Sequence, residues 1–419
     1  MYDRHIAPLL LEALTDTPVV LLNGARQTGK STLAQSLSET VSRRYLTLDD
    51  HTTLAAARTD PVGFIGALAG PVTIDEIQRA PELFLAIKAA VDDARLHGQA
   101  AGRFLLTGSA NVMLLPALAE SLAGRMEIVS LLPLSCAERG GDPLFNRVDW
   151  LFDGDLSVHS LPPCDRGLLI GELLAGGFPE ALARSAPHRR DAWFDSYLQS
   201  VLQRDVRDLA NLEQFVEMPN LLRLLAHRSA SLLNFSELAR SSALPQTTLK
   251  RYFALLETLF LIGRVPAWER NQGKRLVKAP KVFLPDSGVL AHLRGHTLDA
   301  LTAGPGLPGE MVETFVYGEL LKHLAFSARG LTLWHYRTQS GIEVDFLLED
   351  RQGRLTGIEV KASATLTQGD FKGLRHLRET EPERFGRGIV LYTGRECVAF
   401  GDAMFAVPLS AWWFGSETG

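Results

Sequence analysis

The sequence predicts an α/β protein with a mostly parallel amino-terminal sheet, a helical middle region and a second α/β unit at its carboxyl end. Apolar runs alternate with helical patterns over residues 1–135, which is typical of a parallel sheet covered by helices on both faces. Helical periodicity dominates residues 170–265, and strand-like runs return after a long helix that begins at Glu310. A chain of 419 residues is long enough for two or three such domains.

The first domain is expected to span residues 1–139. Its strands are predicted where short apolar runs occur, and its helices where apolar residues recur with helical spacing. The predicted strands are 18–23, 44–48, 70–74, 103–107 and 126–131, and the clearest helices between them are 31–40 and 83–97.

A phosphate-binding loop directly follows the first predicted strand. Residues 24–31 match the pattern G-x-x-x-x-G-K-[ST] in full, and glycines let such a loop curl so that successive N–H groups face one anion. Lys30 is expected to reach the β- and γ-phosphates of ATP, and the Ser31 hydroxyl is expected to bind Mg²⁺. The alternative is a glycine-rich turn that happens to contain a lysine. The expected nucleotide-binding residues are Gly24, Ala25, Arg26, Gln27, Thr28, Gly29, Lys30, Ser31 and Thr32.

Two acids, Asp75 and Glu76, follow the predicted strand 70–74. A parallel strand that ends in Asp75 would bring this carboxylate beside the phosphate loop, where it would hold Mg²⁺ together with Ser31. Glu76 is expected to polarise the attacking water. An acidic pair after a strand is by itself more often a solvated turn. The phosphate loop earlier in the chain favours the functional interpretation.

Two further catalytic candidates are Ser109 and Arg125. Ser109, with Thr107 as a reserve, could hydrogen-bond the attacking water or the γ-phosphate; the alternative is an ordinary transition from strand to turn. Arg125 is a candidate arginine finger that would enter a neighbouring subunit. Its alternative is a surface salt bridge.

These motifs, in this order, resemble the AAA+ superfamily of P-loop ATPases. More closely, the chain resembles a prokaryotic family of AAA+ ATPases that carry a C-terminal domain of unknown function. The resemblance covers nearly the whole chain and implies ATP hydrolysis and assembly into a homo-oligomeric ring such as a hexamer. Its markers are residues 23–30, 48–50, 74–78, 106–109, 121–125, 176–180 and 204–205.

Residues 140–168 are rich in Gly, Pro and Asp and are expected to form a linker or surface loop. A helical lid and winged-helix domain is expected at 169–270, with helices at 193–210 and 218–230. Two further helices, 234–243 and 246–259, are joined by a short turn. Ser236 is expected to cap the first of this pair.

The helix pair resembles a helix-turn-helix unit, with 261–265 as the wing strand. In such units the start of the second helix enters the major groove of DNA. The alternative is a lid or protein-packing module without DNA readout. The expected DNA contacts are Gln246, Thr247, Lys250 and Arg251, and a basic stretch of Lys274, Arg275, Lys278 and Lys281 could contact phosphates or form a solvated loop.

The carboxyl-terminal domain, expected at 271–419, carries acids on alternating strand positions. Glu343 and Asp345 share one face of a predicted strand, and Glu359 and Lys361 share one face of the next. Asp345 and Glu359 could share a divalent metal, with Lys361 stabilising charge on a phosphate.

This arrangement resembles the PD-(D/E)XK nuclease superfamily. The resemblance assigns the helix acid to Glu313, with Glu319 as the alternative, and a supporting role to Gln368. That superfamily contains members that bind without cutting. The alternative without a catalytic role is a surface charge cluster.

Composition limits the remaining possibilities. The formal net charge of -5 means that nucleic-acid binding must come from local basic patches. Cys136, Cys164 and Cys397 are widely spaced, which argues against a disulfide framework or a zinc site. We see no signal peptide and no membrane span, so a cytoplasmic location is expected.

The leading hypothesis is therefore an ATP-hydrolysing AAA+ protein, dependent on Mg²⁺, that acts on branched or damaged DNA through a winged-helix and a nuclease-like domain. One alternative is a nucleotide-controlled regulatory or interaction protein without DNA processing. The other is a metal-dependent nuclease gated by ATP.

Overall fold

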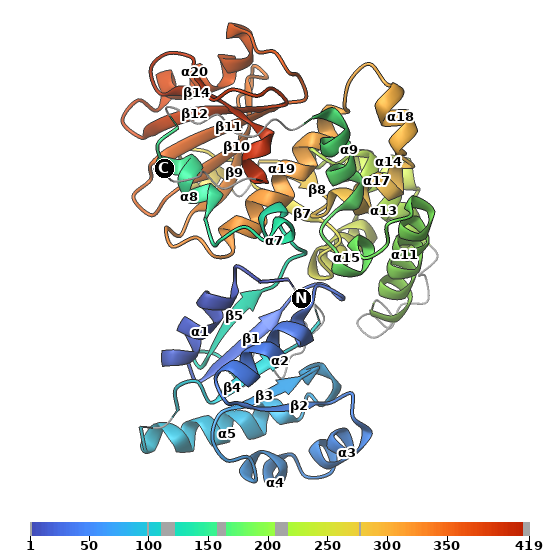
Figure 1. Cartoon of the computed structure of the whole chain (residues 1–419), viewed down its shortest axis with the longest axis vertical. Coiled ribbons are helices and arrows are strands. Elements are labelled where there is room, and N and C mark those ends of the chain that lie inside the picture. Colours follow the sequence, from blue (N-terminus) through green and yellow to red (C-terminus); the bar gives the residue numbers. More distant parts are fainter. Residues whose placement is uncertain are drawn as a thin grey trace.

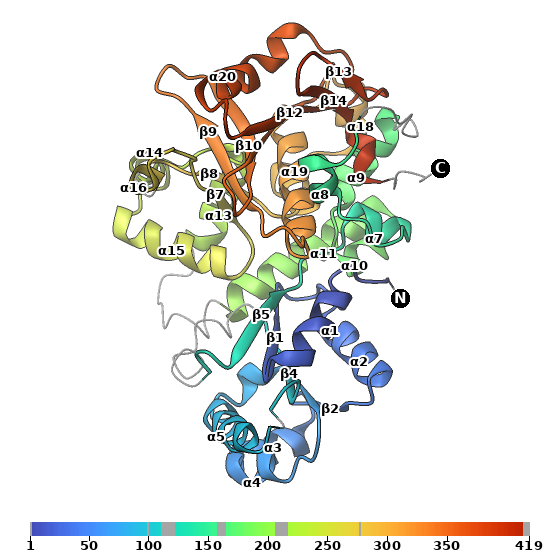
Figure 2. The same ribbon diagram turned by 90° about the vertical axis from the view of Figure 1, so that its left-hand side faces the viewer.

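The computed structural model describes residues 2–98, 100–109, 122–156, 165–205, 217–275 and 278–413. The amino-terminal domain forms one end of an elongated molecule, and the middle and carboxyl-terminal domains lie side by side at the other end (Figure 1). A view turned by 90° shows the same division (Figure 2). Within the described residues, no helix is long and apolar enough to cross a bilayer.

The amino-terminal sheet is parallel, with the strand order β2-β3-β4-β1-β5. Its strands agree with the predicted ones to within two residues. They are β1 (Val19–Asn23), β2 (Arg44–Thr47), β3 (Val72–Asp75), β4 (Phe104–Thr107) and β5 (Met126–Ser130). Because the strands are parallel, the carboxyl ends of β1, β3 and β4 meet at one edge of the sheet, where the candidate residues lie.

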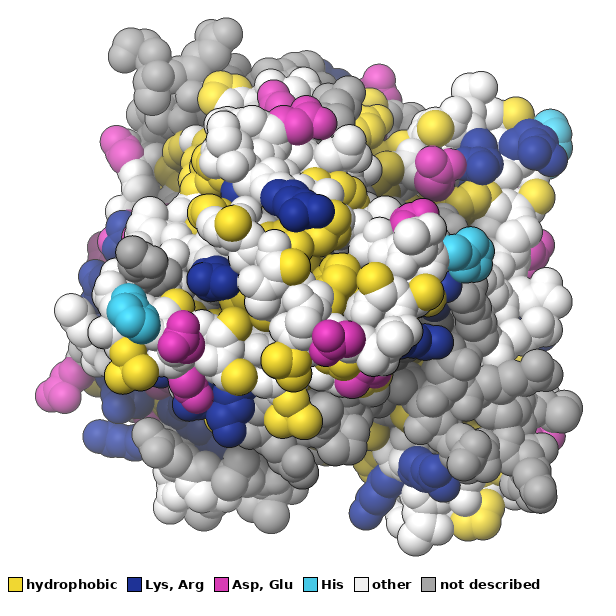
Figure 3. Space-filling view, turned by 90° about the horizontal axis from the view of Figure 1, so that it is seen from below, with side chains coloured by type: hydrophobic (Ala, Val, Ile, Leu, Met, Phe, Trp, Pro, Cys, Tyr) yellow, Lys and Arg dark blue, Asp and Glu magenta, His cyan; other side chains and the backbone are white. Residues whose placement is uncertain are grey.

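Helices cover both faces of this sheet. They are α1 (Ala7–Asp16), α2 (Lys30–Thr40), α3 (His51–Thr59), α4 (Pro61–Gly66) and α5 (Leu83–Leu96). Leu83, Phe84, Ile87 and Val91 of α5 are completely buried, because their spacing places them on one helix face. Seen from below, hydrophobic side chains lie among charged ones on the outer surface of this end (Figure 3).

The expected loop at 140–168 is in part helical. After α7 (Cys136–Gly140) the chain forms α8 (Arg147–Asp153), whose Val148, Leu151 and Phe152 pack into the carboxyl-terminal core. Arg147 is buried; its Nε donates to the Ala411 oxygen at 2.8 Å. Tertiary packing forms this helix, and the local Gly- and Pro-rich composition does not predict it.

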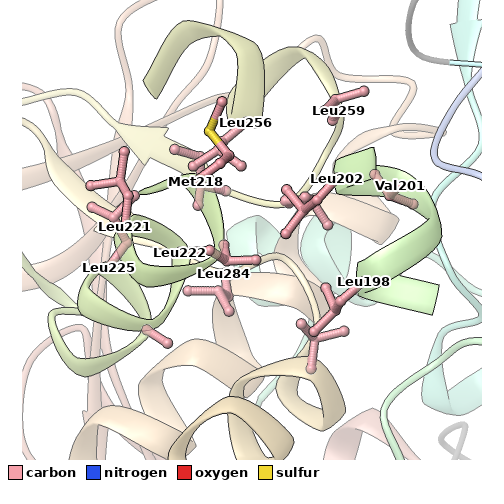
Figure 4. Close-up of a cluster of buried hydrophobic side chains, with 14 of the residues drawn as sticks. Leu198, Val201, Leu202, Met218, Leu221, Leu222, Leu225, Leu256, Leu259 and Leu284 are labelled. Atoms are coloured by element: carbon pink, nitrogen blue, oxygen red, sulfur yellow. The ribbon is translucent and has the colours of Figure 1, made fainter. Parts of the chain in front are cut away.

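The middle domain is a helical layer with a small antiparallel sheet of order β6-β8-β7. Leucines of α11, α13 and α15 make its core together with Met218 and Leu284 (Figure 4). Its elements are α9 (Arg166–Ala175), α10 (Pro179–Leu182), α11 (Pro187–Ser200), α13 (Met218–His227), β6 (Ser231–Leu232), α14 (Phe235–Ser242), α15 (Gln246–Thr258), β7 (Gly263–Val265), α16 (Gln272–Arg275), β8 (Lys281–Phe283), α17 (Ser287–Arg294) and α18 (Leu298–Ala303).

Three details of this domain differ from the expectations. β8 pairs with β6 and β7, so the middle sheet extends past the boundary expected at residue 270. Asn234, not Ser236, caps α14, because the Asn234 side chain accepts from the Ser236 and Glu237 amides. The predicted helix 193–210 ends in a π-helical turn at Val201–Asp205, and residues 206–210 lie outside the described ranges.

The carboxyl-terminal domain is a mixed sheet of order β13-β14-β12-β11-β10-β9. Phe346 and Leu348 of β10 lie in the core under α19 and α8, and Leu347 between them lies in the core under α20, as strand alternation requires. Val344 also lies under α20, because the register of β10 shifts between Val344 and Leu347. Its elements are α19 (Gly309–Leu324), β9 (Thr332–Arg337), β10 (Glu343–Glu349), β11 (Leu355–Lys361), α20 (Lys372–Thr380), β12 (Phe385–Tyr392), β13 (Val398–Ala399) and β14 (Met404–Pro408).

The middle and carboxyl-terminal sheets are joined at the end of β7. The Trp268 amide donates to the His335 oxygen at 2.7 Å, and the His335 amide donates to the Pro266 oxygen at 2.9 Å. These backbone bonds run between the segment after β7 and strand β9, so the two domains share a continuous backbone contact.

Candidate functional site

The loop between β1 and α2 curls tightly around its own backbone. Gly29 has a left-handed φ of 93° directly before α2, a conformation that favours glycine. A Cβ added at Gly24 would lie 2.2 Å from the Leu131 carbonyl oxygen, so this position requires the absence of a side chain. The Asn23 side chain accepts from the Gly24 amide at 2.7 Å and fixes the start of the loop.

Lys30 lies inside the curve of this loop and is only 6% exposed. Its Nζ donates to the carbonyl oxygens of Gly24 at 3.1 Å and Ala25 at 2.7 Å. Its ammonium therefore faces the concave side of the loop, where a phosphate chain would bring negative charge.

Asp75 and Ser31 lie next to each other at the carboxyl edge of the sheet. The Ser31 hydroxyl donates to Asp75 Oδ1 at 2.9 Å, and Asp75 is buried. A hydroxyl and a carboxylate side by side are oxygen ligands of the kind that Mg²⁺ takes, so these residues fit that ion.

Thr107 connects the two acids. Its hydroxyl donates to Asp75 Oδ1 and accepts from the Glu76 amide at 3.1 Å. On sequence grounds Thr107 is expected only as a reserve for Ser109 in contacting water or phosphate. In the structure its hydroxyl contacts protein groups, while Ser109 is buried at the end of β4 and lines the hollow described below.

Glu76 has a left-handed backbone, with φ 60° and ψ 44°, which is unusual for a residue with a side chain. Its carboxylate accepts a hydrogen bond from the Gln78 amide group. Burial raises the pKa of Glu76, and the neighbouring Asp75 raises it further, while Lys30 lowers it.

A hollow of about 390 Å³ opens over these groups. Lys30, Ser31, Glu76 and Ser109 line it from the amino-terminal domain. The middle domain contributes the remaining wall with Pro179, Glu180, Tyr197, Ser200 and Val201. The hollow thus brings together Glu76, Ser109 and six of the predicted loop residues, and Asp75 lies behind Ser31, whereas the wall from α10 and α11 was not predicted.

A second hollow, of about 230 Å³, lies on the other side of Thr28, Gly29 and Thr32. Leu33, Leu37 and Leu134 give it an apolar lining, and Tyr2, Asp3, Arg4, Ala7, Ser36 and Pro179 complete it. Sequence reasoning missed this hollow because its walls come from distant segments.

Arg4 ties the amino-terminal segment to the phosphate loop. Its guanidinium donates to the Thr28 oxygen at 2.8 Å and to the Leu132 oxygen at 2.7 Å, and it pairs with Glu138 at 3.0 Å. Arg4 is not part of any motif in the sequence, so no local signal pointed to it.

Arg125 lies far from the hollow of its own chain. It directly precedes β5, whose first residue pairs with the first residue of β1, so it lies at the sheet edge opposite the loop. Its guanidinium makes two hydrogen bonds to the Asp92 carboxylate, at 2.7 Å and 3.0 Å. The salt bridge weighed as an alternative is therefore present within the chain.

The predicted DNA-contact residues lie at the exposed start of α15. Gln246, Thr247, Lys250 and Arg251 are all exposed. Lys250 lies over the Phe235 ring, with 5.9 Å between its Nζ and the ring centroid.

The three described side chains of the basic stretch after α15, Arg275, Lys278 and Lys281, form neither the phosphate-contacting surface nor the solvated loop that the sequence suggested. Arg275 makes two bonds to Glu349, at 2.8 Å and 3.0 Å, and Lys278 pairs with Glu269. Lys281 is buried, so it is neither a solvated residue nor a surface phosphate contact. Carboxylates of the same chain bind these three cations, and the local sequence does not show those distant partners.

The predicted carboxyl-terminal residues Glu313, Asp345, Glu359 and Lys361 lie close together, and Lys281 of β8 joins them. Lys281 Nζ lies 2.8 Å from Glu313 Oε1 and 2.9 Å from Asp345 Oδ1. Lys361 Nζ lies 2.8 Å from Glu359 Oε1. Burial, followed by the nearby Asp345, raises the pKa of both Glu313 and Glu359 to about 8.

The other predicted members of this cluster lie elsewhere. Glu319 accepts from the Cys136 amide at 3.1 Å and pairs with Lys322, so Glu313 is the acid of α19 that reaches the cluster. Glu343 pairs with Arg337, and the Gln368 side chain pairs with Arg375. In the part of the chain that the structure describes, no three His, Cys, Asp or Glu side chains are arranged to hold a metal ion.

Comparison with known families divides the chain into three matched segments. Residues 16–139 match an AAA domain. Residues 167–300 match a domain of unknown function (DUF8612), and residues 308–412 match another, DUF4143.

Two curated relatives match almost the whole chain. The uncharacterized protein Rv2008c of Mycobacterium tuberculosis is 32% identical over 410 residues, which cover 97% of this chain and 83% of the relative. The uncharacterized protein Mb2031c of Mycobacterium bovis gives the same values.

Solved structures give more distant matches. A Walker-type ATPase of Pyrococcus abyssi has a TM-score of 0.41 at 16% identity, covering 70% of this chain and 96% of its own. The RuvB Holliday junction branch migration motor of Thermotoga maritima has a TM-score of 0.31 at 18% identity, covering 63% and 90%. These scores are too low to support an argument about function.

Proposed function

This chain belongs to the family of the two mycobacterial proteins and carries a match to an AAA domain over residues 16–139, and we propose that it binds Mg-ATP in the hollow at the β1–α2 loop and hydrolyses the bond between the β- and γ-phosphates there. One observation carries the proposal. A single hollow gathers Lys30 and Ser31 of the loop with Glu76 and Ser109, which follow two neighbouring strands, and the Ser31 hydroxyl at its wall bonds to the buried Asp75.

In this proposal the loop amides and Lys30 hold the phosphates. Lys30 exchanges its bonds to the Gly24 and Ala25 carbonyls for bonds to the β- and γ-phosphate oxygens. Ser31 and Asp75 would hold Mg²⁺, which when bound neutralises charge on the phosphates.

Glu76 positions the attacking water, and its hydrogen bond to Gln78 must open for it to do so. Ser109 lines the same hollow and is close enough to take part in water or γ-phosphate binding. Thr107 holds the Asp75 carboxylate and the Glu76 backbone amide in place.

The test uses Lys30→Ala and Glu76→Gln variants. Lys30→Ala removes the phosphate-binding cation, so nucleotide binding is lost; Glu76→Gln keeps binding but stops turnover. Binding is measured with a fluorescent ATP analogue, and turnover by phosphate release. Lys88→Ala on α5, outside the hollow, is the control. Normal turnover in Glu76→Gln, or normal binding in Lys30→Ala, contradicts the assignment.

We also propose that the middle domain senses the nucleotide. Glu180, Tyr197 and Val201 line the same hollow as the phosphate loop, so binding and loss of a γ-phosphate change the contacts of α10 and α11. This role agrees with the lid expected from the sequence.

A second proposal is that α15 contacts DNA. The proposal is supported by the element order α13-β6-α14-α15-β7-α16-β8 with a three-stranded sheet, which is similar to that of a winged helix, and by the exposed start of α15. Only Lys250 and Arg251 supply positive charge there, so we expect weak binding that depends strongly on salt.

The DNA proposal is tested by measuring ATP turnover with and without linear and branched DNA, together with DNA binding at low salt. The double variant Lys250→Glu/Arg251→Glu should lose both the stimulation and the binding, whereas Lys88→Glu should keep them. If the unmodified protein neither binds DNA nor turns over ATP faster in its presence, the DNA role is wrong and the regulatory alternative remains.

We propose further that Arg125 acts on the nucleotide of a neighbouring subunit in a homo-oligomeric ring. Its place at the opposite sheet edge rules out a contact with the loop of its own chain. Mass measurement with and without a non-hydrolysable ATP analogue tests this. A chain that stays monomeric under both conditions has no use for Arg125 in trans.

A further inference from the structure

The carboxylates of the carboxyl-terminal domain already surround a cation that belongs to the chain. We propose that the Lys281 ammonium takes the position of a divalent cation between Glu313 and Asp345, and that the domain is therefore a non-hydrolytic module locked to the middle domain. The proposal concerns this cluster alone and does not depend on the ATPase assignment.

Lys281 satisfies the geometry of an internal counter-ion. Its Nζ contacts Glu313 at 2.8 Å and Asp345 at 2.9 Å, and the residue is only 3% exposed. Desolvated charges at such distances attract strongly and exclude a second cation from the same space.

The remaining oxygens of the cluster are mostly engaged. Asp345 Oδ2 accepts from the Val360 amide at 3.0 Å, and Glu359 Oε1 pairs with Lys361. Glu359 Oε2 is buried without a hydrogen-bond partner. Mg²⁺ requires near-octahedral oxygen coordination, and three carboxylates that each already bind a lysine of the chain do not supply it.

The surrounding structure holds Lys281 in place. It lies on β8, which pairs with β6 on one side and β7 on the other, next to α19 in the ribbon view (Figure 1). His335 of β9 lies 3.1 Å from the Ala279 oxygen just before β8. Lys281 is therefore part of a paired strand and not of a side arm that could swing away.

An aromatic stack joins the same three elements, β8, α19 and β10, that the ionic cluster joins. Phe283 of β8 stacks on Tyr317 of α19, with 4.4 Å between ring centroids, and lies 5.5 Å from the Phe346 ring of β10. These rings come from the same three elements as Lys281, Glu313 and Asp345. An ionic cluster and a neighbouring aromatic stack thus join the middle domain to the carboxyl-terminal domain.

The test is a Mn²⁺ titration of the full chain without nucleotide, followed by the electron paramagnetic resonance of free Mn²⁺. Lys281→Met keeps the apolar stem and removes the ammonium. We expect it to gain one Mn²⁺ site per chain that the unmodified protein lacks, with a rise in Tm on adding Mn²⁺. The double variant Lys281→Met/Asp345→Asn should lose the gained site, and Lys281→Arg should remain without it.

Two results overturn the proposal. One is a folded Lys281→Met protein that gains no Mn²⁺ site. The other is a Mn²⁺ site in the unmodified protein that Glu359→Gln or Asp345→Asn abolishes. This second arm needs no change at Lys281, so it remains decisive even where Lys281→Met does not fold. The unmodified protein and all of these variants keep the same weak Mn²⁺ binding near Ser31, so it cancels when their titrations are compared.

Discussion

Replacing Thr107 by valine removes one hydroxyl beside Asp75 and Glu76 in the proposed nucleotide site while keeping the side-chain shape. That hydroxyl donates to Asp75 Oδ1 and accepts from the Glu76 amide at 3.1 Å. A hydrogen bond to a charged group contributes about 1.5–3 kcal/mol, and the amide bond contributes about 1 kcal/mol more. If only the bond to Asp75 is lost in the transition state, kcat already falls roughly 10- to 100-fold.

The assay is steady-state phosphate release together with binding of a fluorescent nucleotide. Thr107→Val should lower kcat and leave nucleotide affinity nearly unchanged, because the phosphate loop is intact. Thr107→Ser restores the hydroxyl and should restore the rate. Thr73→Val, which removes a buried hydroxyl bonded to Ser38, should affect stability but not kcat. A wild-type rate in folded Thr107→Val, or equal losses of binding and turnover, refutes this reasoning.

Three further predictions follow from contacts described above. Gly24→Ala places a methyl group 2.2 Å from the Leu131 oxygen, so nucleotide affinity should fall by at least about tenfold in the fluorescence assay; unchanged affinity would mean that the loop adapts. The pKa values of Glu359 and Glu313 are raised from the ordinary 4.5 to about 8, so the folded chain binds more protons than the unfolded chain between these two pH values. Thermal stability should therefore decline as pH rises from about 4.5 to about 8, and Glu359→Gln should flatten that decline in a melting series. Arg147→Met breaks a buried ion pair with Asp142 and a bond to the Ala411 oxygen, and should lower the unfolding free energy by about 3–5 kcal/mol; a variant that melts like wild type contradicts the role given to α8.

The amino-terminal domain was the most predictable part of the chain. Its three central strands, β1, β3 and β4, are short apolar runs that are buried on both faces, so composition alone marks them, and the loop motif fixes which strand is β1. Asp75 and Glu76 could be found because a parallel sheet brings strand ends together. The sequence could not show that Thr107 binds both acids, because that contact depends on the detailed geometry of neighbouring strand ends.

The carboxyl-terminal cluster was predictable only in part. Period-two spacing placed Glu359 and Lys361 on one strand face, and a resemblance supplied Glu313. Lys281 was missed because it lies on β8, a strand of the middle domain, and nothing in the sequence links that strand to α19. Helix α8 and Arg147 were missed for the same reason, since distant tertiary partners stabilise them.

The backbone bonds between the segment after β7 and β9 have a mechanical consequence. The middle and carboxyl-terminal domains are therefore expected to move together. Bending between them would break the backbone pairing of Trp268 with His335 and the ion pairs of Lys281. Under the proposed function, movement of α10 and α11 on nucleotide binding would be passed to residues 132–138, where Arg4 binds the Leu132 oxygen and Glu138. A small rotation about this segment would therefore produce its largest displacement at the far end of the carboxyl-terminal sheet.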